Sequence, residues 1–289
     1  MSNLARPLTP PVDPAGDLLD ELRAARAGAA PLPGLDPATY ARSHEGFERL
    51  SDQRQLIAAD LAARLLRHEG DVSVLSVGCG DGTLDAALAT ALVDADPGRR
   101  VRWTGVEPYA GSAAAFAERL GRLTGRGLDL EVHATTFDEA PVAGPFDVIT
   151  FVHSMYYVPD VAAAVRRAHD LLRPGGELLV LSAPRAELNA LVEVLAPPVE
   201  GHEQWFSDDV AAGVRATGLR ADTPTTLGAR WDAAAADDEV LDFAVQARLT
   251  DDLRPTVRSY LSVVSAASPG DRVPHPVDVH RVVRRPCSG

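Results

Sequence analysis

Apolar residues recur along this chain with two different spacings, and the alternation between them predicts its elements. Apolar or alternating runs of strand length cover 72–78, 101–106, 129–134, 146–152 and 177–183. Between them, apolar residues three and four positions apart predict helices at 83–93, 110–122 and 159–172. Strands and helices that alternate in this way are typical of a parallel sheet covered by helices on both faces.

The two ends of the chain have different patterns of apolar and polar residues from the middle. Residues 1–35 are rich in Pro, Ala and Gly with one helical stretch at 18–26, and residues 36–70 have a helical pattern. After residue 200 the patterns predict helices at 207–217, 237–248 and 252–263 and strands near 220–226 and 277–284. We therefore expect an α/β fold: a doubly wound, Rossmann-like, mostly parallel seven-stranded sheet with a helical N-terminal cap and C-terminal helical additions. The expected division is 1–70, a tail and helical substrate cap, and 71–289, the main domain.

The composition and net charge of the chain restrict the kinds of partner that it is expected to bind. The chain has 289 residues and a formal net charge of −13 at pH 7, which argues against nucleic acid and against an anionic membrane surface. Cys79 and Cys287 form no disulfide framework or zinc-binding spacing. The sequence begins without an apolar leader and contains no apolar stretch of about 18 residues. We expect a cytoplasmic protein, monomer or homodimer, with no metal.

The clearest candidate site begins at "VLSVGCGDGTLD", where a strand pattern ends in Gly78, Gly80 and Gly82 before a helix pattern. This spacing is tighter than the G-x-G-x-x-G of dinucleotide-binding proteins, so a nucleoside with a short tail could bind there instead. Glu107 ends the second strand in "WTGVEP". A carboxylate in that position can accept two strong hydrogen bonds from a ribose diol.

Two further motifs complete the pattern. The fourth strand ends in the polar and aromatic block "FVHSMYYVPD", and "LLRPGGELLVL" reads as a helix end, a Pro-Gly-Gly turn and a fifth strand. In this order, over roughly 72–183, the chain resembles the class I S-adenosylmethionine-dependent methyltransferases. "YARSHEGFERLSDQRQ" at 40–55 and later helices extend a closer resemblance, to the histamine N-methyltransferase type, over most of 40–250.

The resemblance implies roles for particular residues. It places S-adenosyl-L-methionine against Gly78, Gly80, Asp81, Glu107, Pro108, Ser112, Thr135, Thr136 and Val152. It places a small aromatic acceptor against Tyr40, Phe47, Gln53, His153, Tyr156, Tyr157 and Trp205. His153, as a proton acceptor, and Tyr157, through its π face, are the candidate catalytic residues.

Departures from the resembled family alter the expected acceptor. Ser76 stands where many class I enzymes have an acid, so the amine of the cofactor needs another partner, for which Asp81 is a candidate. The family's glutamate that binds a cationic amine aligns with Gln53, and its glutamine after strand four aligns with His153. Without that acid, a neutral aromatic or indole-like acceptor fits better than histamine.

Three hypotheses follow for the function. The first is N-methylation of a small aromatic or heteroaromatic molecule, of the kind met in specialised metabolism. The second uses carbon as the nucleophile, for example in an electron-rich indole. The third is a catalytically inactive S-adenosylmethionine-binding subunit of a larger assembly.

Overall fold

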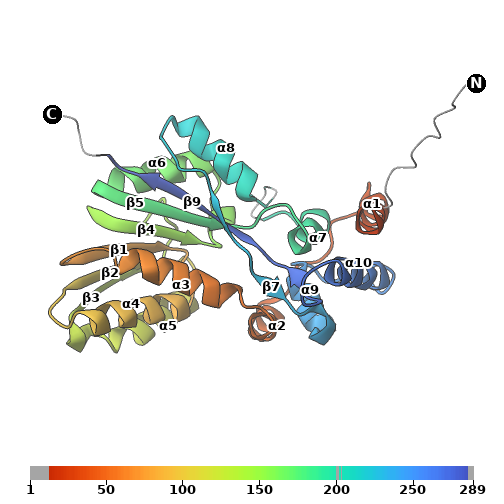
Figure 1. The fold of residues 1–289 in the computed structure, drawn as a ribbon, viewed down its shortest axis with the longest axis horizontal. Helices are drawn as coiled ribbons and strands as arrows, with labels where there is room; N and C mark the ends of the chain where they lie inside the picture. The colour runs from red at the N-terminus through yellow and green to blue at the C-terminus, as the bar shows by residue number, and fades with distance from the viewer. Residues whose placement is uncertain (1–12, 200–201, 203, 286–289) are drawn as a thin grey trace, which may run out of the picture.

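A seven-stranded sheet forms the centre of the protein, which we describe from a computed structural model that covers residues 13–199, 202 and 204–285 (Figure 1). The strand order is β3-β2-β1-β4-β5-β9-β6. The first five of these strands are parallel, whereas β9 is antiparallel to both β5 and β6. The strands are β1 (Val72–Val77), β2 (Val101–Val106), β3 (Leu128–His133), β4 (Phe146–Val152), β5 (Leu172–Ser182), β6 (Thr225–Leu227) and β9 (Val277–Val283).

Helices cover both faces of the sheet. On one face, α3 (Gln53–Leu65), α4 (Thr83–Ala95) and α5 (Ala110–Gly121) bury apolar side chains against β1 and β2. On the other face lie α6 (Val161–Leu171) and α8 (Ser207–Thr217), which also pack against each other. Because β1 and β4 are buried on both sides, their sequences are almost continuously apolar.

A second, helical layer lies beside the sheet (Figure 1). It contains α1 (Pro14–Arg26), α2 (Pro37–Arg49), α7 (Leu188–Leu195), α9 (Asp238–Ala244), α10 (Arg254–Ala266) and the short strands β7 (Arg230–Trp231) and β8 (Val273–Pro274). Its apolar core joins Leu22 of α1 and Phe47 of α2 to Leu241 of α9 and Leu261 of α10. Segments from both ends of the chain therefore build this layer, whereas α3 belongs to the sheet.

The fold class expected from the sequence is confirmed, and three local expectations need correction. The Pro-Gly-Gly turn lies inside β5, because Gly175 and Gly176 form backbone hydrogen bonds with Arg284 and a register shift absorbs the extra residues. Helix α7 went unpredicted because it is a run of only eight mostly apolar residues, too short to be distinguished from a buried strand by its pattern. The strand expected near 220–226 is only Thr225–Leu227.

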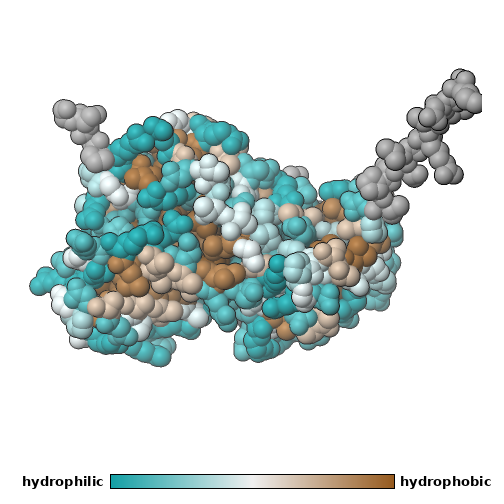
Figure 2. Space-filling view, in the orientation of Figure 1, coloured by the Kyte–Doolittle hydropathy of each residue, from teal (hydrophilic) through white to brown (hydrophobic). Residues whose placement is uncertain are grey.

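Hydrophilic side chains cover most of the face seen in Figure 2, and an apolar patch lies over α3 and α4. Leu56 and Leu66, in and just after α3, are among the exposed large apolar residues. Within the described residues, no helix combines the length and apolar character needed to cross a bilayer.

Candidate active site

The glycine loop after β1 is fixed on one side and open on the other. Gly78 has a φ of +63°, and a Cβ there would lie 2.4 Å from Cβ of Ser154, so only glycine fits. Gly80 also has a positive φ, of +57°, but a Cβ on it would meet nothing within 4 Å. The loop thus packs against the end of β4 through Gly78 and presents the backbone of Gly80 to open space.

Glu107 lies directly beside this open loop. Its Oε2 accepts a hydrogen bond from the Gly80 amide at 3.0 Å, and its Oε1 accepts one from the Tyr109 amide at 3.0 Å. A carboxylate has about four acceptor positions, so both oxygens can still accept from the two hydroxyls of a ribose. The half-buried carboxylate and the uncovered Gly80 backbone are the features that a nucleoside cofactor requires, and the residues present fit S-adenosylmethionine.

Most other predicted cofactor residues share this edge of the sheet. Thr135 and Thr136 follow β3, Val152 ends β4, and Pro108 and Ser112 lie between β2 and the first turn of α5. Because β3, β2, β1 and β4 are neighbours and parallel, their carboxyl ends meet at one edge, where open α/β sheets bind ligands.

Asp81 differs from these residues because its carboxylate already has partners within the protein. It accepts hydrogen bonds from the amide and the hydroxyl of Thr83, at 3.0 and 2.9 Å, and forms an ion pair with Arg119 at 3.1 Å. Asp81 therefore orders the start of α4. Its role toward the amine of the cofactor stays a prediction.

Three tyrosines lie next to the cofactor edge. Tyr156 and Tyr157 occupy a 3₁₀ turn just after β4, with their ring centroids 4.8 Å apart in an edge-to-face arrangement. Tyr40 of α2 shares a side-chain hydrogen bond with Tyr157. Burial, followed by the charges of Glu48 and Glu107, raises the pKa of Tyr40. Helix α2 thus brings an aromatic side chain within the electrostatic reach of the ribose-binding candidate Glu107.

Phe47 and Trp205, the other predicted aromatic wall residues, lie deeper. Phe47 is only 8% exposed and packs against Trp231, Phe243 and His275 in the core of the helical layer. Trp205 donates its indole N–H to the carbonyl of Val158 at 2.9 Å, which joins it to the segment after the paired tyrosines. Phe47 supports Tyr40 indirectly, because both rings contact Phe243. Trp205 contacts the segment that follows Tyr156 and Tyr157.

A buried polar network connects the end of β4 with α3 and the segment before β9. Nε2 of His153 lies 2.8 Å from Oε1 of Gln53, and Nε2 of Gln53 donates to the carbonyl of His275 at 2.8 Å. Nδ1 of His275 lies 3.2 Å from the hydroxyl of Ser51. Both ends of the Gln53 amide therefore have partners within the protein, although the sequence predicts it as a substrate-binding residue.

The titration of His153 differs from the sequence expectation. A histidine usually titrates near neutral pH, which favours it as a base. Here burial, with a smaller contribution from Arg54, lowers the pKa of His153 from 6.5 to about 4. His153 is therefore neutral throughout the physiological range. It is also held at a φ of +49°, a strained conformation of the kind that clusters at functional sites.

Sequence reasoning missed the charged group closest to the aromatic site. Glu48 of α2 forms an ion pair with Arg54 at 2.6 Å and lies 3.7 Å from the ring of His44. Burial, the largest cause, lowers the pKa of His44. Neutralised by Arg54, Glu48 is poorly suited to bind a cationic amine. His275 was missed as well, because its partners lie more than 200 positions away in the sequence.

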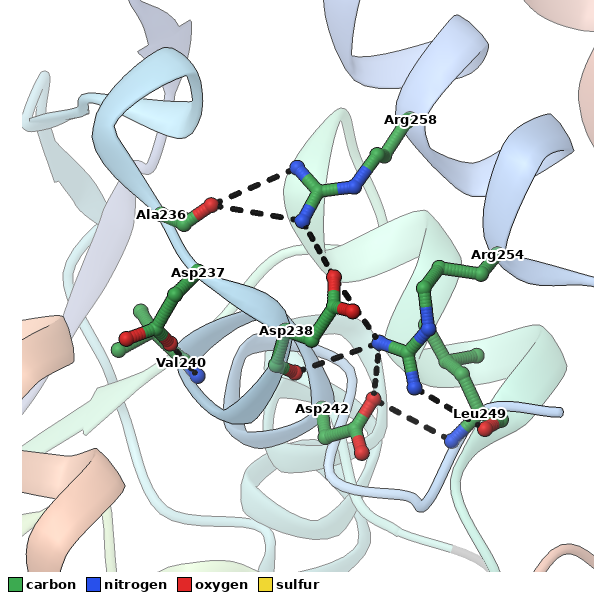
Figure 3. Close-up of polar contacts among 8 residues, drawn as sticks. All are labelled: Ala236, Asp237, Asp238, Val240, Asp242, Leu249, Arg254 and Arg258. Carbon is green, nitrogen blue, oxygen red and sulfur yellow. Dashed lines mark hydrogen bonds and ion pairs between the residues drawn. The ribbon is translucent and has the colours of Figure 1, made fainter. Parts of the chain in front are cut away.

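Paired charges join α9 to α10 (Figure 3). Arg254 of α10 forms an ion pair with Asp242 at 2.8 Å, and Arg258 forms one with Asp238 at 2.6 Å. The Arg254 and Asp242 side chains are only 17% and 15% exposed, so water and salt screen this pair less than a surface pair. Through α9, these contacts hold Phe243 against Tyr40 of α2.

The described residues contain no group of three or more His, Cys, Asp or Glu side chains arranged to hold a metal ion.

Together, the sheet order, the glycine loop and Glu107 define a class I S-adenosylmethionine-dependent methyltransferase domain. A family model described as "Methyltransferase domain" matches residues 44–223, and the chain belongs to that family. The matched segment contains the glycine loop, Glu107, the tyrosines of the β4 turn, Gln53 and His153.

Individual relatives are more distant. A ubiquinone biosynthesis O-methyltransferase of Pseudomonas paraeruginosa is 31% identical over 125 residues, 42% of this chain and 49% of that protein. The chain thus spans about half the length of the curated relatives it matches. The YcgJ protein of Bacillus subtilis has a similar structure, with a TM-score of 0.52, 14% identity and coverage of 79% of this chain and 98% of its own.

The same fold also serves other chemistry. The [4+2]-cyclase SpnF superposes with a TM-score of 0.50 at 17% identity, and covers 93% of this chain and 94% of its own. A likeness at this identity concerns the fold alone. The reaction of the present protein has to be argued from its own site.

Proposed function

We propose that this protein transfers a methyl group from S-adenosylmethionine to a nitrogen of a small, neutral aromatic or heteroaromatic molecule. The observation that carries the proposal is the position of α2 beside the cofactor edge. Tyr40 of α2 shares a side-chain hydrogen bond with Tyr157, and the charge of Glu107 is close enough to raise the pKa of Tyr40. An aromatic surface and a ribose-binding carboxylate thereby adjoin each other.

Glu107, the Gly80 backbone and the residues that follow β3 would hold the cofactor. When bound, S-adenosylmethionine supplies an activated methyl group: the acceptor's electron pair bonds the methyl carbon, the C–S pair passes to sulfur, and S-adenosylhomocysteine is released. Positioning can supply much of the acceleration of such a displacement, because oriented reactants reach effective molarities of about 10⁵ M or more.

The tyrosines provide that positioning. Tyr157 is 46% exposed and Tyr40 is 39% exposed, so both present ring surface that a flat acceptor can cover. Tyr156 is half-buried, and burial raises its pKa well above its usual value of 10. The three rings offer apolar faces and O–H groups, a lining suited to an aromatic body with few polar atoms.

His153 would accept the proton that the acceptor loses. Its low pKa prevents it from deprotonating a resting acceptor at neutral pH. As the methyl group bonds, however, an N–H group becomes positively charged and far more acidic, and a neutral imidazole is then a sufficient base. The neutral ring is ready for this step at every physiological pH.

The charges around the site favour a neutral acceptor over histamine. Gln53 offers an amide, and Glu48 is bound by Arg54. A buried ammonium without a carboxylate partner is costly, because its hydration is lost without compensation. The resemblance to the histamine type therefore concerns the surrounding residues of the site, whereas the glutamate that would bind a cationic amine is replaced by Gln53.

The acceptor atom distinguishes the candidate reactions. Nitrogen comes from the histamine-type resemblance, carbon of an electron-rich indole is the alternative, and the name of the relatives adds a phenolic oxygen. Incubation with methyl-¹³C-labelled cofactor and a panel of neutral aromatic amines, indoles and phenols tests all three. The carbon shift of the product identifies the atom.

We expect the label on nitrogen. Label on carbon or oxygen would overturn the assignment to nitrogen, and the protein would still be a methyltransferase. Cofactor binding with no transfer to any member of the panel would favour the inactive-subunit hypothesis.

A further inference from the structure

Gln53 has a role that its place in the sequence does not reveal. It is 7% exposed, and the atoms of its side-chain amide contact His153 on one side and the His275 backbone on the other.

The His275 carbonyl determines how the Gln53 amide is oriented. A carbonyl oxygen can only accept a hydrogen bond, so the amide atom 2.8 Å from it must be the NH₂ group. The opposite orientation would place two acceptor oxygens in contact. The atom facing His153 is therefore Oε1, which can only accept.

The orientation of the amide in turn determines the histidine tautomer. Nε2 of His153 is 2.8 Å from an obligate acceptor, so this nitrogen must carry the proton. In the neutral ring the other nitrogen, Nδ1, then has the free lone pair. Nδ1 has no hydrogen-bond partner within the described part of the chain, and it is not among the buried atoms left unsatisfied. It is therefore accessible to a ligand.

We propose that Gln53 is a positioning residue that holds His153 as the Nε2–H tautomer, so that Nδ1 is the atom that accepts the acceptor molecule's proton. The chain of contacts runs from the His275 carbonyl through the amide to the imidazole. His153 directly follows β4 and precedes the turn that carries Tyr156 and Tyr157. This inference deepens the proposed function and rests on it for the identity of the proton donor.

The groups that face His153 also agree with a neutral, single tautomer. Burial and the positive charge of Arg54 on α3 both oppose protonation of His153, and His153 in turn lowers the pKa of His275. The imidazolium, which would donate from both nitrogens, is therefore suppressed.

The test is nitrogen NMR of the full chain labelled with ¹⁵N-histidine, in the absence of cofactor and acceptor. His153→Asn identifies the His153 signals, because asparagine tolerates the positive φ at this position. We expect the wild-type ring to be protonated at Nε2 and unprotonated at Nδ1. A proton on Nδ1 would overturn the proposal.

Two variants separate positioning from simple packing. Gln53→Leu removes the acceptor, and His153 is expected to lose its single tautomer and give averaged nitrogen shifts. Gln53→Glu keeps an acceptor and adds negative charge, so the pKa of His153 should rise in the same spectra. His280, buried on β9 beside Ser207, should be unaffected in both variants and reports that the fold is intact.

The possible outcomes distinguish this inference from the proposed function. A fixed Nε2–H tautomer in a protein that transfers no methyl group would retain the positioning role and reject the reaction. Methyl transfer with an unchanged tautomer in Gln53→Leu and an unchanged pKa in Gln53→Glu would reject the positioning role and retain the reaction.

Discussion

Nε2 of His153 lies 2.8 Å from Oε1 of Gln53, although the two residues are 100 positions apart in the sequence. The contact joins the carboxyl end of β4 to the first residue of α3. It thereby connects the helices that approach the acceptor side with the sheet edge that holds the cofactor residues. Its geometry leads to predictions for binding, specificity and stability.

Replacement of Glu107 by alanine should weaken S-adenosylmethionine binding at least tenfold. The change removes two charge-assisted hydrogen bonds to the ribose, each worth roughly 1.5–3 kcal/mol. Titration calorimetry measures the loss. Glu107→Gln keeps an acceptor for the Gly80 amide and so separates loss of charge from a shift of the loop. Glu118→Ala, which removes an exposed carboxylate on α5, is the matched control. Unchanged affinity in Glu107→Ala would refute the assignment.

Neutral aromatic acceptors, such as N-acylated tryptamines or heteroaryl compounds, should be methylated in preference to histamine. Gln53 supplies no charge, and Arg54 neutralises Glu48. Gln53→Glu should shift the preference toward histamine, because it replaces a neutral amide with a carboxylate. A competition assay with labelled cofactor measures the acceptor preference of both the wild type and Gln53→Glu. Preferential methylation of histamine by the wild type would contradict the account of the pocket.

The free energy of unfolding should fall as the pH decreases from about 6.5 toward 4. Burial lowers the pKa of His153 from 6.5 to about 4 and, with His153 as a second cause, that of His275 from 6.5 to about 3. In this window the unfolded chain binds protons that the folded chain excludes, so acid favours unfolding.

Urea denaturation of the wild type and His275→Gln isolates this effect from the titration of the carboxylates. One pKa unit corresponds to about 1.4 kcal/mol, so the stability difference between the two proteins should decrease by roughly 2 kcal/mol between pH 7 and pH 4.5. A difference that stays constant over this range would show that His275 is not excluded from protonation.

Asp85→Asn should stabilise the protein at pH 7. Oδ1 of Asp85 accepts the indole N–H of Trp103 at 3.0 Å, and burial raises the pKa of this carboxyl from 3.8 to about 6. A raised pKa means that stability falls as the pH rises through this window, because the folded state must then release a proton that stabilises it. Asparagine keeps an acceptor for Trp103 without the buried charge.

The expected gain is on the order of 1–3 kcal/mol at pH 7, and it should disappear near pH 4, where the wild-type carboxyl is protonated. Thermal or urea denaturation at the two pH values measures it. A variant that is destabilised equally at both values would indicate that the carboxylate itself is required.

The sequence predicts the sheet and its helices well, because the signals for them are local. The glycine loop and Glu107 lie at the ends of strands whose apolar runs are evident, and parallel strands bring these ends together. Helix α7 gives a weaker signal, because Leu188–Leu195 is a short and mostly apolar run that could equally be a buried strand.

The acceptor side was harder to predict because its contacts join distant segments. Gln53 is recognisable only as a departure from a family pattern, whereas its contact with the His275 carbonyl spans 222 positions. The family resemblance predicted Phe47 as a pocket wall, but the burial of that ring depends on Trp231 and Phe243. No local pattern contains this information.

The most direct test of the account is the turnover of labelled methyl groups by His153→Asn at saturating acceptor, with cofactor affinity measured on the same sample. Asparagine accommodates the positive φ of this position but supplies no basic nitrogen. If Nδ1 of His153 accepts the acceptor's proton, turnover should fall about 10²-fold or more while the affinity for S-adenosylmethionine stays unchanged. Wild-type turnover in this variant would contradict the account and leave His153 with a structural role.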